Sequence, residues 1–393
     1  LMAGVQNLPL ASPSFSTDAM TMKMVGIGQR IPAPGKLASQ TKVARMEAAA
    51  MEAQSLVTER DVRREVSDAY YDVVAANDLL AVTSRAQAVL TAFLPAAEAQ
   101  YASGSGAQFD LVKARLEATR LAADGAQFAE DRRAALARLA AALLANEDQP
   151  ATRMGHDSGM ISTSDVGPPS AFPWPARVVR AALGDTSAVS HFTATTLDAR
   201  VSRSPVPSAD SLFALAVQRS GTLRAHEAMI GAATARTELA ALATRPDIDI
   251  TLQYGQRVAR SDMIMATVSI PLPLQRRRNQ DAETAAAHAD VDALEAEHGA
   301  QLAALRRDVA RLASALERDR TQLAIYRAAL IPQARAGVAT LTASYGAGRA
   351  SLASVVDAQT MTLMYESQYV RALADFAKTL AELEQLVGTE VMP

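Results

Sequence analysis

The sequence predicts a mainly α-helical protein with a small β part, in which a β-hairpin followed by a long antiparallel helical hairpin occurs twice. Apolar residues make up 49% of the chain but aromatic residues only 4%, so alanine carries much of the apolar content, as suits closely packed long helices. Two pairs of segments have strand-like patterns. Self-similarity at a fixed offset marks an internal repeat. One pattern occurs twice with equal spacing, at Tyr101, Gly104, Val112 and Ala114 and at Tyr345, Gly348, Val356 and Ala358.

The first repeat begins with a β-hairpin over residues 1–35. Segments 1–10 and 20–31 flank a loop of small and polar residues. Pro32 and Pro34 end the second strand, because proline cannot donate to a strand ladder.

A long helical hairpin follows over residues 36–146. Apolar residues recur every three or four positions from 36 to 100, which predicts a helix about 95 Å long, bent at Pro95. A turn near 101–110 joins it to a second helix over 108–146, and two long helices joined by a short turn form an antiparallel hairpin.

Residues 147–209 contain many prolines and predict a linker with one short helix near 176–183. Structureless loops of this length are uncommon in compact domains, so we expect the linker to wrap against the helices. Segment 210–246 predicts the helix that opens the second repeat.

A second β-hairpin is expected over 247–274. Its alternation is typical of a barrel strand with an apolar face toward lipid and a polar face inward. The motif Ile31-Pro32-Ala33-Pro34 recurs 239 residues later as Ile270-Pro271-Leu272-Pro273. At the same offset, Val25 and Ile27 correspond to Ile264 and Ala266, which predicts that they lie on the apolar face of the first hairpin. The apolar positions are Ile248, Ile250, Leu252 and Tyr254 on one strand and Ile264, Ala266 and Val268 on the other.

The second long helical hairpin is expected over 275–388. One helix covers 279–344, a turn lies within 345–354, and a second helix runs until Gly388 ends it. Residues 389–393 form a tail.

Composition excludes several function classes. A net charge of −3 excludes the strongly basic surface of a nucleic-acid-binding protein, and the absence of cysteine removes disulfides, thiolate metal sites and cysteine nucleophiles. No run of about 18 consecutive apolar residues predicts a transmembrane helix. A signal peptide is expected to be removed or to lie outside this sequence. No catalytic motif and no cofactor site is found, so we expect no enzyme activity.

The predicted strands are too few to form a closed membrane structure alone. Two hairpins give four strands, and an open sheet edge in lipid would leave unpaired N–H and C=O groups at a cost of several kcal/mol each. Copies of the chain must therefore share one barrel, from which the long helices extend into an aqueous space.

These features resemble the TolC family of outer-membrane efflux factors. The resemblance rests on the Tyr-x-x-Gly turns, the Ile-Pro-x-Pro strand ends and the terminal Leu386-Val387-Gly388, and segment 20–36 is most similar to the heavy-metal cation efflux branch. The resemblance implies a homotrimer with a 12-strand β-barrel in the outer membrane of a Gram-negative bacterium and an α-helical tunnel in the periplasm. It also implies docking to a periplasmic adaptor and an inner-membrane RND pump.

The turns at Tyr101, Gly104, Tyr345 and Gly348 would then be the tips that contact the adaptor. Glycine allows a positive φ and a close approach of another backbone. The alternative is that both turns only reverse the chain.

Two acidic residues follow these turns. The resemblance implies that Asp110 and Asp357 ring the tunnel aperture, where a three-fold arrangement would concentrate negative potential and favour cations. Ser354 departs from the family pattern at a position where a second acid is expected. A single aspartate near a helix start also commonly caps the helix or lies in solvent.

No usual metal motif is present, since the histidines have no ligand spacing. Met20, Met22 and Met24 alternate on one strand face and are joined by Met263 and Met265. Thioethers suit Cu(I) or Ag(I), but methionine is also a flexible filler of lumen or subunit contacts.

The function predicted is a passive outer-membrane exit duct of a tripartite RND-type efflux system, with heavy-metal cations as cargo. Two alternatives stay open at this stage. One is a multidrug efflux or type I secretion duct on the same fold, and the other is a soluble coiled-coil scaffold.

Overall fold

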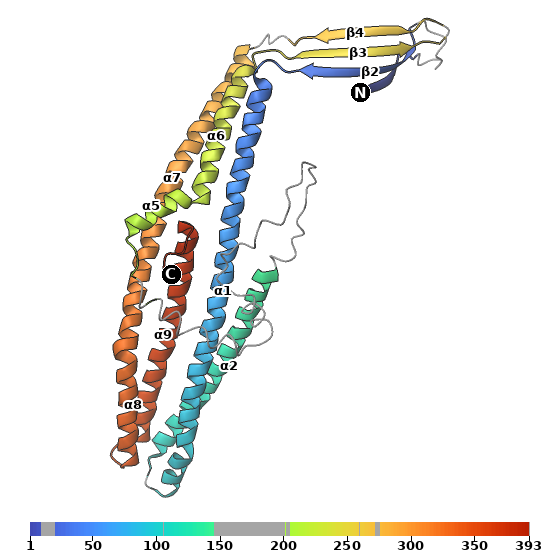
Figure 1. The fold of residues 1–393 in the computed structure, drawn as a ribbon. Coiled ribbons are helices and arrows are strands. Elements are labelled where there is room, and N and C mark those ends of the chain that lie inside the picture. The colour runs from blue at the N-terminus through green and yellow to red at the C-terminus, as the bar shows by residue number, and fades with distance from the viewer. Residues whose placement is uncertain are drawn as a thin grey trace, which may run out of the picture. The chain divides into compact units, whose positions relative to one another are not determined.

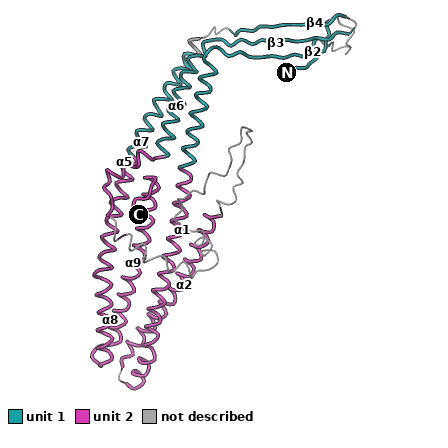
Figure 2. The backbone as a smooth tube through the Cα atoms, viewed as in Figure 1, with its two compact units in different colours: residues 1–56, 221–303 teal, residues 57–220, 304–393 magenta. Residues whose placement is uncertain are grey.

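The structure is a computed structural model that describes residues 1–8, 20–104, 106–144, 201, 205–258, 260–271 and 276–392. The predicted loop 11–19, the short helix near 176–183 and most of the linker lie outside these residues. The chain divides into two compact units, Leu1–Leu56 with Gly221–Ala303 and Val57–Ser220 with Ala304–Pro393 (Figure 2). Each unit combines segments of both sequence repeats.

The first unit contains one four-stranded antiparallel sheet in the order β1-β2-β3-β4 (Figure 1). Both predicted hairpins are confirmed. Strands β2 and β3 join the two repeats through a register that runs from Lys23 opposite Gln256 to Ile31 opposite Ile248. The strands are β1 Met2–Gln6, β2 Met22–Ile31, β3 Ile248–Gln256 and β4 Met263–Ser269.

The register confirms the predicted apolar face of the sheet. Val25 lies opposite Tyr254, and Tyr254 lies opposite Ile264 on the next strand, so all three side chains share one face. Ile264 is 76% exposed and Val25 57% exposed. An apolar face left uncovered on so many neighbouring residues marks contact with an apolar environment outside the chain.

Helix segments complete the first unit. They belong to α1 Lys36–Ala102, α6 Gly221–Leu242 and α7 Arg276–Ile325. Two ion pairs join α6 to α1. Lys42 on α1 pairs with Glu238 on α6 at 2.8 Å, and Arg236 on α6 pairs with Glu47 on α1. The Thr237 hydroxyl donates to the backbone carbonyl of Ala287 on α7 at 3.2 Å.

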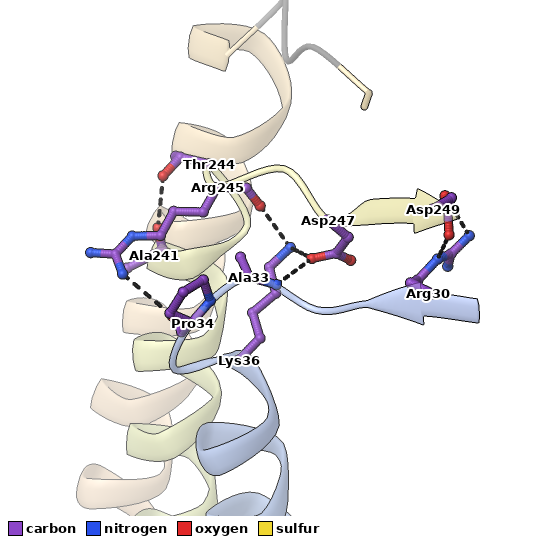
Figure 3. Close-up of polar contacts among 9 residues, drawn as sticks. All are labelled: Arg30, Ala33, Pro34, Lys36, Ala241, Thr244, Arg245, Asp247 and Asp249. Carbon is purple, nitrogen blue, oxygen red and sulfur yellow. Dashed lines mark hydrogen bonds and ion pairs between the residues drawn. The ribbon is translucent and has the colours of Figure 1, made fainter. Parts of the chain in front are cut away.

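A polar cluster lies where β2 leads into α1 and where α6 leads into β3 (Figure 3). The Lys36 ammonium donates to the Asp247 carboxylate and to the Arg245 carbonyl, both at 2.8 Å. Asp247 also accepts the Ala33 N–H at 3.0 Å, and the Arg245 guanidinium donates to the Pro34 carbonyl at 3.4 Å. The end of the first hairpin is thereby bonded to the start of the second.

The second unit is helical. Its buried core contains Val73, Leu212, Leu316, Phe376 and Leu383. The helices are the remainder of α1 and α7, then α2 Gln108–Leu144, α5 Ala209–Arg219, the π-helix η1 Tyr326–Leu330, α8 Ile331–Gly346 and α9 Leu352–Val387. The expected long helices are therefore present, and α1 contains Pro95 within it, as predicted.

Two helices differ from the sequence prediction. The helix predicted over 210–246 is two helices, because Ser220 takes an extended conformation and ends α5. The helix predicted over 279–344 contains a π-turn just before Pro332. Proline lacks the N–H for an i to i−4 hydrogen bond, and a π-turn is a local adjustment of that ladder.

Among the described residues, α1 is the one helix long and apolar enough to cross a membrane, and its most apolar stretch is only partly buried. That stretch is not a continuous run of apolar residues, so the sequence predicted no span there. One such helix is weak evidence of a span, because core helices pass the same test.

The Asp247 contacts predict an acid-sensitive junction. The Lys36 hydrogen bond, with the Ala33 N–H, lowers the pKa of Asp247. A carboxyl whose pKa falls on folding stabilises the protein fully above about pH 4, and this contribution is lost as the pH drops through the folded-state pKa. Asp247→Asn should therefore lower the melting temperature of the detergent-solubilised protein at pH 7.

The same substitution should have a smaller effect near pH 2, because the wild-type carboxyl becomes protonated as the pH falls through its lowered pKa. Circular dichroism melts at both pH values test this, with Glu59→Gln as a control, since Glu59 makes only an exposed pair with Arg63. Equal destabilisation by Asp247→Asn at both pH values would contradict the assignment.

Candidate functional site at the paired helical turns

The two helical turns have the same backbone geometry. Gly104 has φ +72° and Gly348 has φ +70°, which are left-handed conformations that glycine adopts without steric cost. The Gly104 N–H donates to the Tyr101 carbonyl at 3.0 Å, and the Gly348 N–H donates to the Tyr345 carbonyl at 2.9 Å. The repeat found in the sequence is therefore also a repeat in structure.

Packing against the described residues does not require either glycine. A Cβ placed on Gly104 or Gly348 would meet none of their atoms within 4 Å. The need for glycine at these positions comes from the positive φ, and the surface above both turns is open to another molecule.

The two turns lie side by side within the second unit. The Tyr345 hydroxyl donates to the Gln100 side-chain oxygen at 3.0 Å, and the Phe93 ring packs edge-to-face on Tyr345 with centroids 6.2 Å apart. Burial, with the Asp110 carboxylate nearby, raises the pKa of Tyr345. A buried apolar cluster from both hairpins lies behind these contacts and includes Leu90, Leu111, Leu121, Leu352 and Val356.

Asp110 bonds the first hairpin to the second. It lies in the first turn of α2, and its carboxylate accepts the N–H of Leu352, the first residue of α9, at 3.2 Å. The Ser351 hydroxyl accepts the Ser354 N–H at 3.2 Å in the same turn. A carboxylate at a helix N-terminus is stabilised by the unpaired N–H groups and the helix dipole. Asp110 thus acts as a cap supplied by the other repeat.

Asp357 is paired with a cation from the equivalent position of the other repeat. The Lys113 ammonium lies 2.6 Å from the Asp357 carboxylate, and each residue follows its turn glycine by the same number of positions. The Asp357 side chain is 65% exposed and that of Lys113 is 28% exposed. An exposed pair of this kind contributes at most about 1 kcal/mol, so it can open without unfolding the turns.

The contacts of Asp110 and Asp357 limit how strongly these carboxylates can attract cations. Each carboxylate already faces a positive partner, either a helix N-terminus or an ammonium group, so the negative potential around the turns is reduced. The aperture role of Asp110 and Asp357 stays a prediction, and it depends on the Lys113 pair. Ser354, the departure from the acidic pattern, is hydrogen-bonded to Ser351 at 3.0 Å.

Sequence reasoning missed Lys113 and Gln100 as residues of this site. A signal for Lys113 was available, because aligning the two repeats places a lysine opposite Asp357. Farther along α1, away from the turns, burial raises the pKa of the Asp78 carboxyl to about 6 in spite of Arg85, and sequence reasoning did not single out this residue either. Its partial burial depends on tertiary packing.

In the parts of the chain that the structure describes, no group of three or more His, Cys, Asp or Glu side chains could hold a metal ion. Of the methionine candidates, Met22 and Met24 lie on β2, on the sheet face opposite the apolar one, whereas Met20 precedes the strand.

The family model "Outer membrane efflux protein" matches residues 2–143 and 212–389. The chain belongs to the outer membrane efflux protein family. The resemblance to the TolC family is thereby confirmed, and the protein is an outer-membrane efflux channel rather than an enzyme or a soluble scaffold.

Solved channels of this outer membrane efflux type have the same fold. The Neisseria gonorrhoeae MtrE outer membrane channel in its open state is 16% identical, with a TM-score of 0.73, and the match covers 100% of this chain and 80% of that one. VceC from Vibrio cholerae is 14% identical with a TM-score of 0.69, covering 99% and 86%. CusC is 15% identical with a TM-score of 0.70, covering 94% and 78%. No curated protein sequence matches significantly.

The Lys113–Asp357 pair predicts opposite changes in ion selectivity. Lys113→Ala leaves the Asp357 carboxylate unpaired and should increase the preference for cations, whereas Asp357→Ala leaves the ammonium unpaired and should decrease it. Reversal potentials of single channels in a planar bilayer under a KCl gradient measure both changes.

Arg133→Ala is a control, because Arg133 forms an exposed pair with Glu130 within α2, away from the turns. If both substitutions at the pair left the reversal potential unchanged, Asp357 would have no place in the aperture.

Proposed function

We propose that this chain is the outer-membrane duct of a tripartite RND-type export system and works as a homotrimer. The observation that carries the proposal is the sheet of the first unit. It has an uncovered apolar face, and within the described residues β1 and β4 each have one side without a partner strand.

The edges of this sheet favour assembly of several copies. The number three comes from the resemblance to the TolC family, since two copies would also give an allowed barrel of eight strands. In lipid every unpaired N–H and C=O costs several kcal/mol, so the edge of β1 in one copy must pair with β4 of the next. Bacterial barrels contain even numbers of strands from eight upward. Three copies of the four-stranded sheet give twelve strands, and their apolar faces would together form the lipid-facing surface.

The paired turns suit contact with a periplasmic adaptor. Gly104 and Gly348 expose backbone with no neighbouring side chain above it, and Tyr101 is 44% exposed beside them. Backbone that is open in this way can be approached closely by the residues of a partner helix hairpin. The energy for export would come from the inner-membrane pump, since the duct itself is passive.

Heavy-metal cations are the proposed cargo. The proposal is supported by the similarity of segment 20–36 to the heavy-metal branch and by the methionines on the sheet face opposite the lipid-facing one. The alternative is a duct of the same fold that exports drugs or secreted proteins. The cargo experiment must distinguish this alternative from a heavy-metal duct.

The assembly is tested with the purified full-length chain in detergent. Light scattering should give a protein mass of about three times 41.5 kDa, and reconstitution into planar bilayers should give stable conductance steps. A monomer that dissolves without detergent and produces no conductance would overturn the proposal.

The cargo is tested in a strain lacking the gene. Loss of tolerance to heavy-metal salts with unchanged tolerance to dyes and detergents supports the metal assignment. Raised dye or detergent sensitivity with unchanged metal tolerance would replace it by a multidrug duct.

The adaptor contact is tested at Gly348 with two substitutions. Asparagine tolerates the left-handed conformation, whereas valine does not. If close approach of a partner backbone matters, both Gly348→Asn and Gly348→Val should reduce export several-fold while the trimer and its conductance persist. If only the turn conformation matters, Gly348→Asn should export normally.

Gly337→Asn is the matched control, since Gly337 lies within α8 and a Cβ there also meets nothing within 4 Å. Normal export by both Gly348 variants would remove this turn from the adaptor interface.

A further inference from the structure

Methionines gather on the sheet face opposite the apolar one. The prediction that Met263 and Met265 share a face with Met22 and Met24 is confirmed by the register of the strands. Met24 lies opposite Gly255, and Gly255 lies opposite Met263, so these positions share one face. Met2 on β1 joins them, since it lies opposite Gly26.

Gly255 is the centre of a smaller group within this face. Met24 flanks it on β2 and Met263 flanks it on β4, and both side chains are half-buried. The Sδ atom of Met22 lies above the glycine, 2.6 Å from the place where a Cβ would be. Because residue 255 has no side chain, the Met22 thioether can extend over β3 toward β4. Three methionines therefore lie at positions that border one glycine.

The distances between strands allow these side chains to meet. Neighbouring strands are about 4.8 Å apart, so Met24 and Met263 are separated by about 10 Å across the bare glycine position. Methionine has three rotatable bonds and adapts to irregular spaces, which lets sulfur atoms converge on one point between the strands.

The chemistry of the group selects one class of cation. Thioethers are soft neutral ligands that prefer Cu(I) and Ag(I), whereas Zn²⁺ is bound in proteins by thiolate, imidazole or carboxylate groups. We infer that Met22, Met24 and Met263 form a three-thioether site for a soft monovalent cation, Cu(I) or Ag(I), on the inner face of the barrel.

The inference rests on the proposed function as a metal-export duct, in which the site serves transit rather than storage. Conduction requires a site that attracts the ion but still releases it. Three uncharged thioethers meet this requirement, because they coordinate the cation without neutralising its charge. Carboxylates are hard ligands, which suit a soft monovalent cation less well than thioethers do and would also admit hard divalent cations.

The site is tested by titrating AgNO₃ into the full-length protein in detergent and chloride-free buffer, with isothermal calorimetry as the readout. Wild type should bind Ag(I) at one site per chain. Met22→Leu/Met24→Leu/Met263→Leu should bind it at least tenfold more weakly. Leucine replaces methionine with little loss of packing, so the variant should keep its circular dichroism spectrum and its assembly state.

Met361→Leu/Met364→Leu is the control, because both methionines are exposed on α9, outside the sheet. It should bind Ag(I) like wild type. Silver K-edge absorption of the wild-type complex should show sulfur neighbours that the triple variant lacks, and Zn(NO₃)₂ should give no heat assigned to this site.

Unchanged Ag(I) affinity in the triple variant would overturn the site, as would an equal loss in the α9 control. Planar-bilayer conductance of the same preparations reports separately on the duct. A protein that binds Ag(I) through these methionines but never conducts would contradict the proposed function and leave the site intact. A protein that conducts but binds no Ag(I) would contradict only the site.

Discussion

The unpaired edges of the four-stranded sheet are the constraint on which the rest of the structure depends. Water can satisfy an open strand edge, but lipid cannot, and the apolar face shared by Val25, Tyr254 and Ile264 is suited to lipid. In the proposed assembly these edges would pair between copies. The chain would then supply one segment of the channel, and contacts between copies would matter as much as contacts within each copy.

Within one chain, polar contacts hold the two repeats together in each unit. Lys36 at the start of α1 pairs with Asp247 just before β3 in the first unit, and Lys113 and Asp357 join the turns in the second unit. Lys113 and Asp357 occupy equivalent positions of the two repeats, each the same number of residues after its turn glycine. The bond between them therefore requires the repeats to differ at this position, with lysine in one and aspartate in the other.

Much of the fold could be predicted from the sequence, because its signals are local. The strict alternation of apolar and polar residues predicted β3, and the glycines predicted the helical turns. The internal repeat predicted that Val25 and Ile27 lie on the apolar face. The contacts that define the site are not local in this sense. The Asp110 cap on Leu352 and the position of the Met22 sulfur over Gly255 depend on which repeat segments become neighbours. The break at Ser220 and the π-turn at Tyr326 each lie beside a helix-breaking residue, Gly221 and Pro332, a local signal that helix periodicity outweighed in the sequence prediction.

The π-turn has a consequence for the direction in which α8 presents its side chains. Buried positions along α7 follow steps of three and four residues up to Leu323 and Tyr326, but the next buried residue, Ile331, follows after five. One extra residue rotates everything beyond it by about 100° about the helix axis. The segment that carries Leu341 and Tyr345 can thus pack on a different apolar cluster from the one that α7 contacts. The π-turn therefore turns the apolar side of this continuous helix to a new direction part-way along its length. Successive segments of the helix can then pack on two different apolar clusters without a break in the chain.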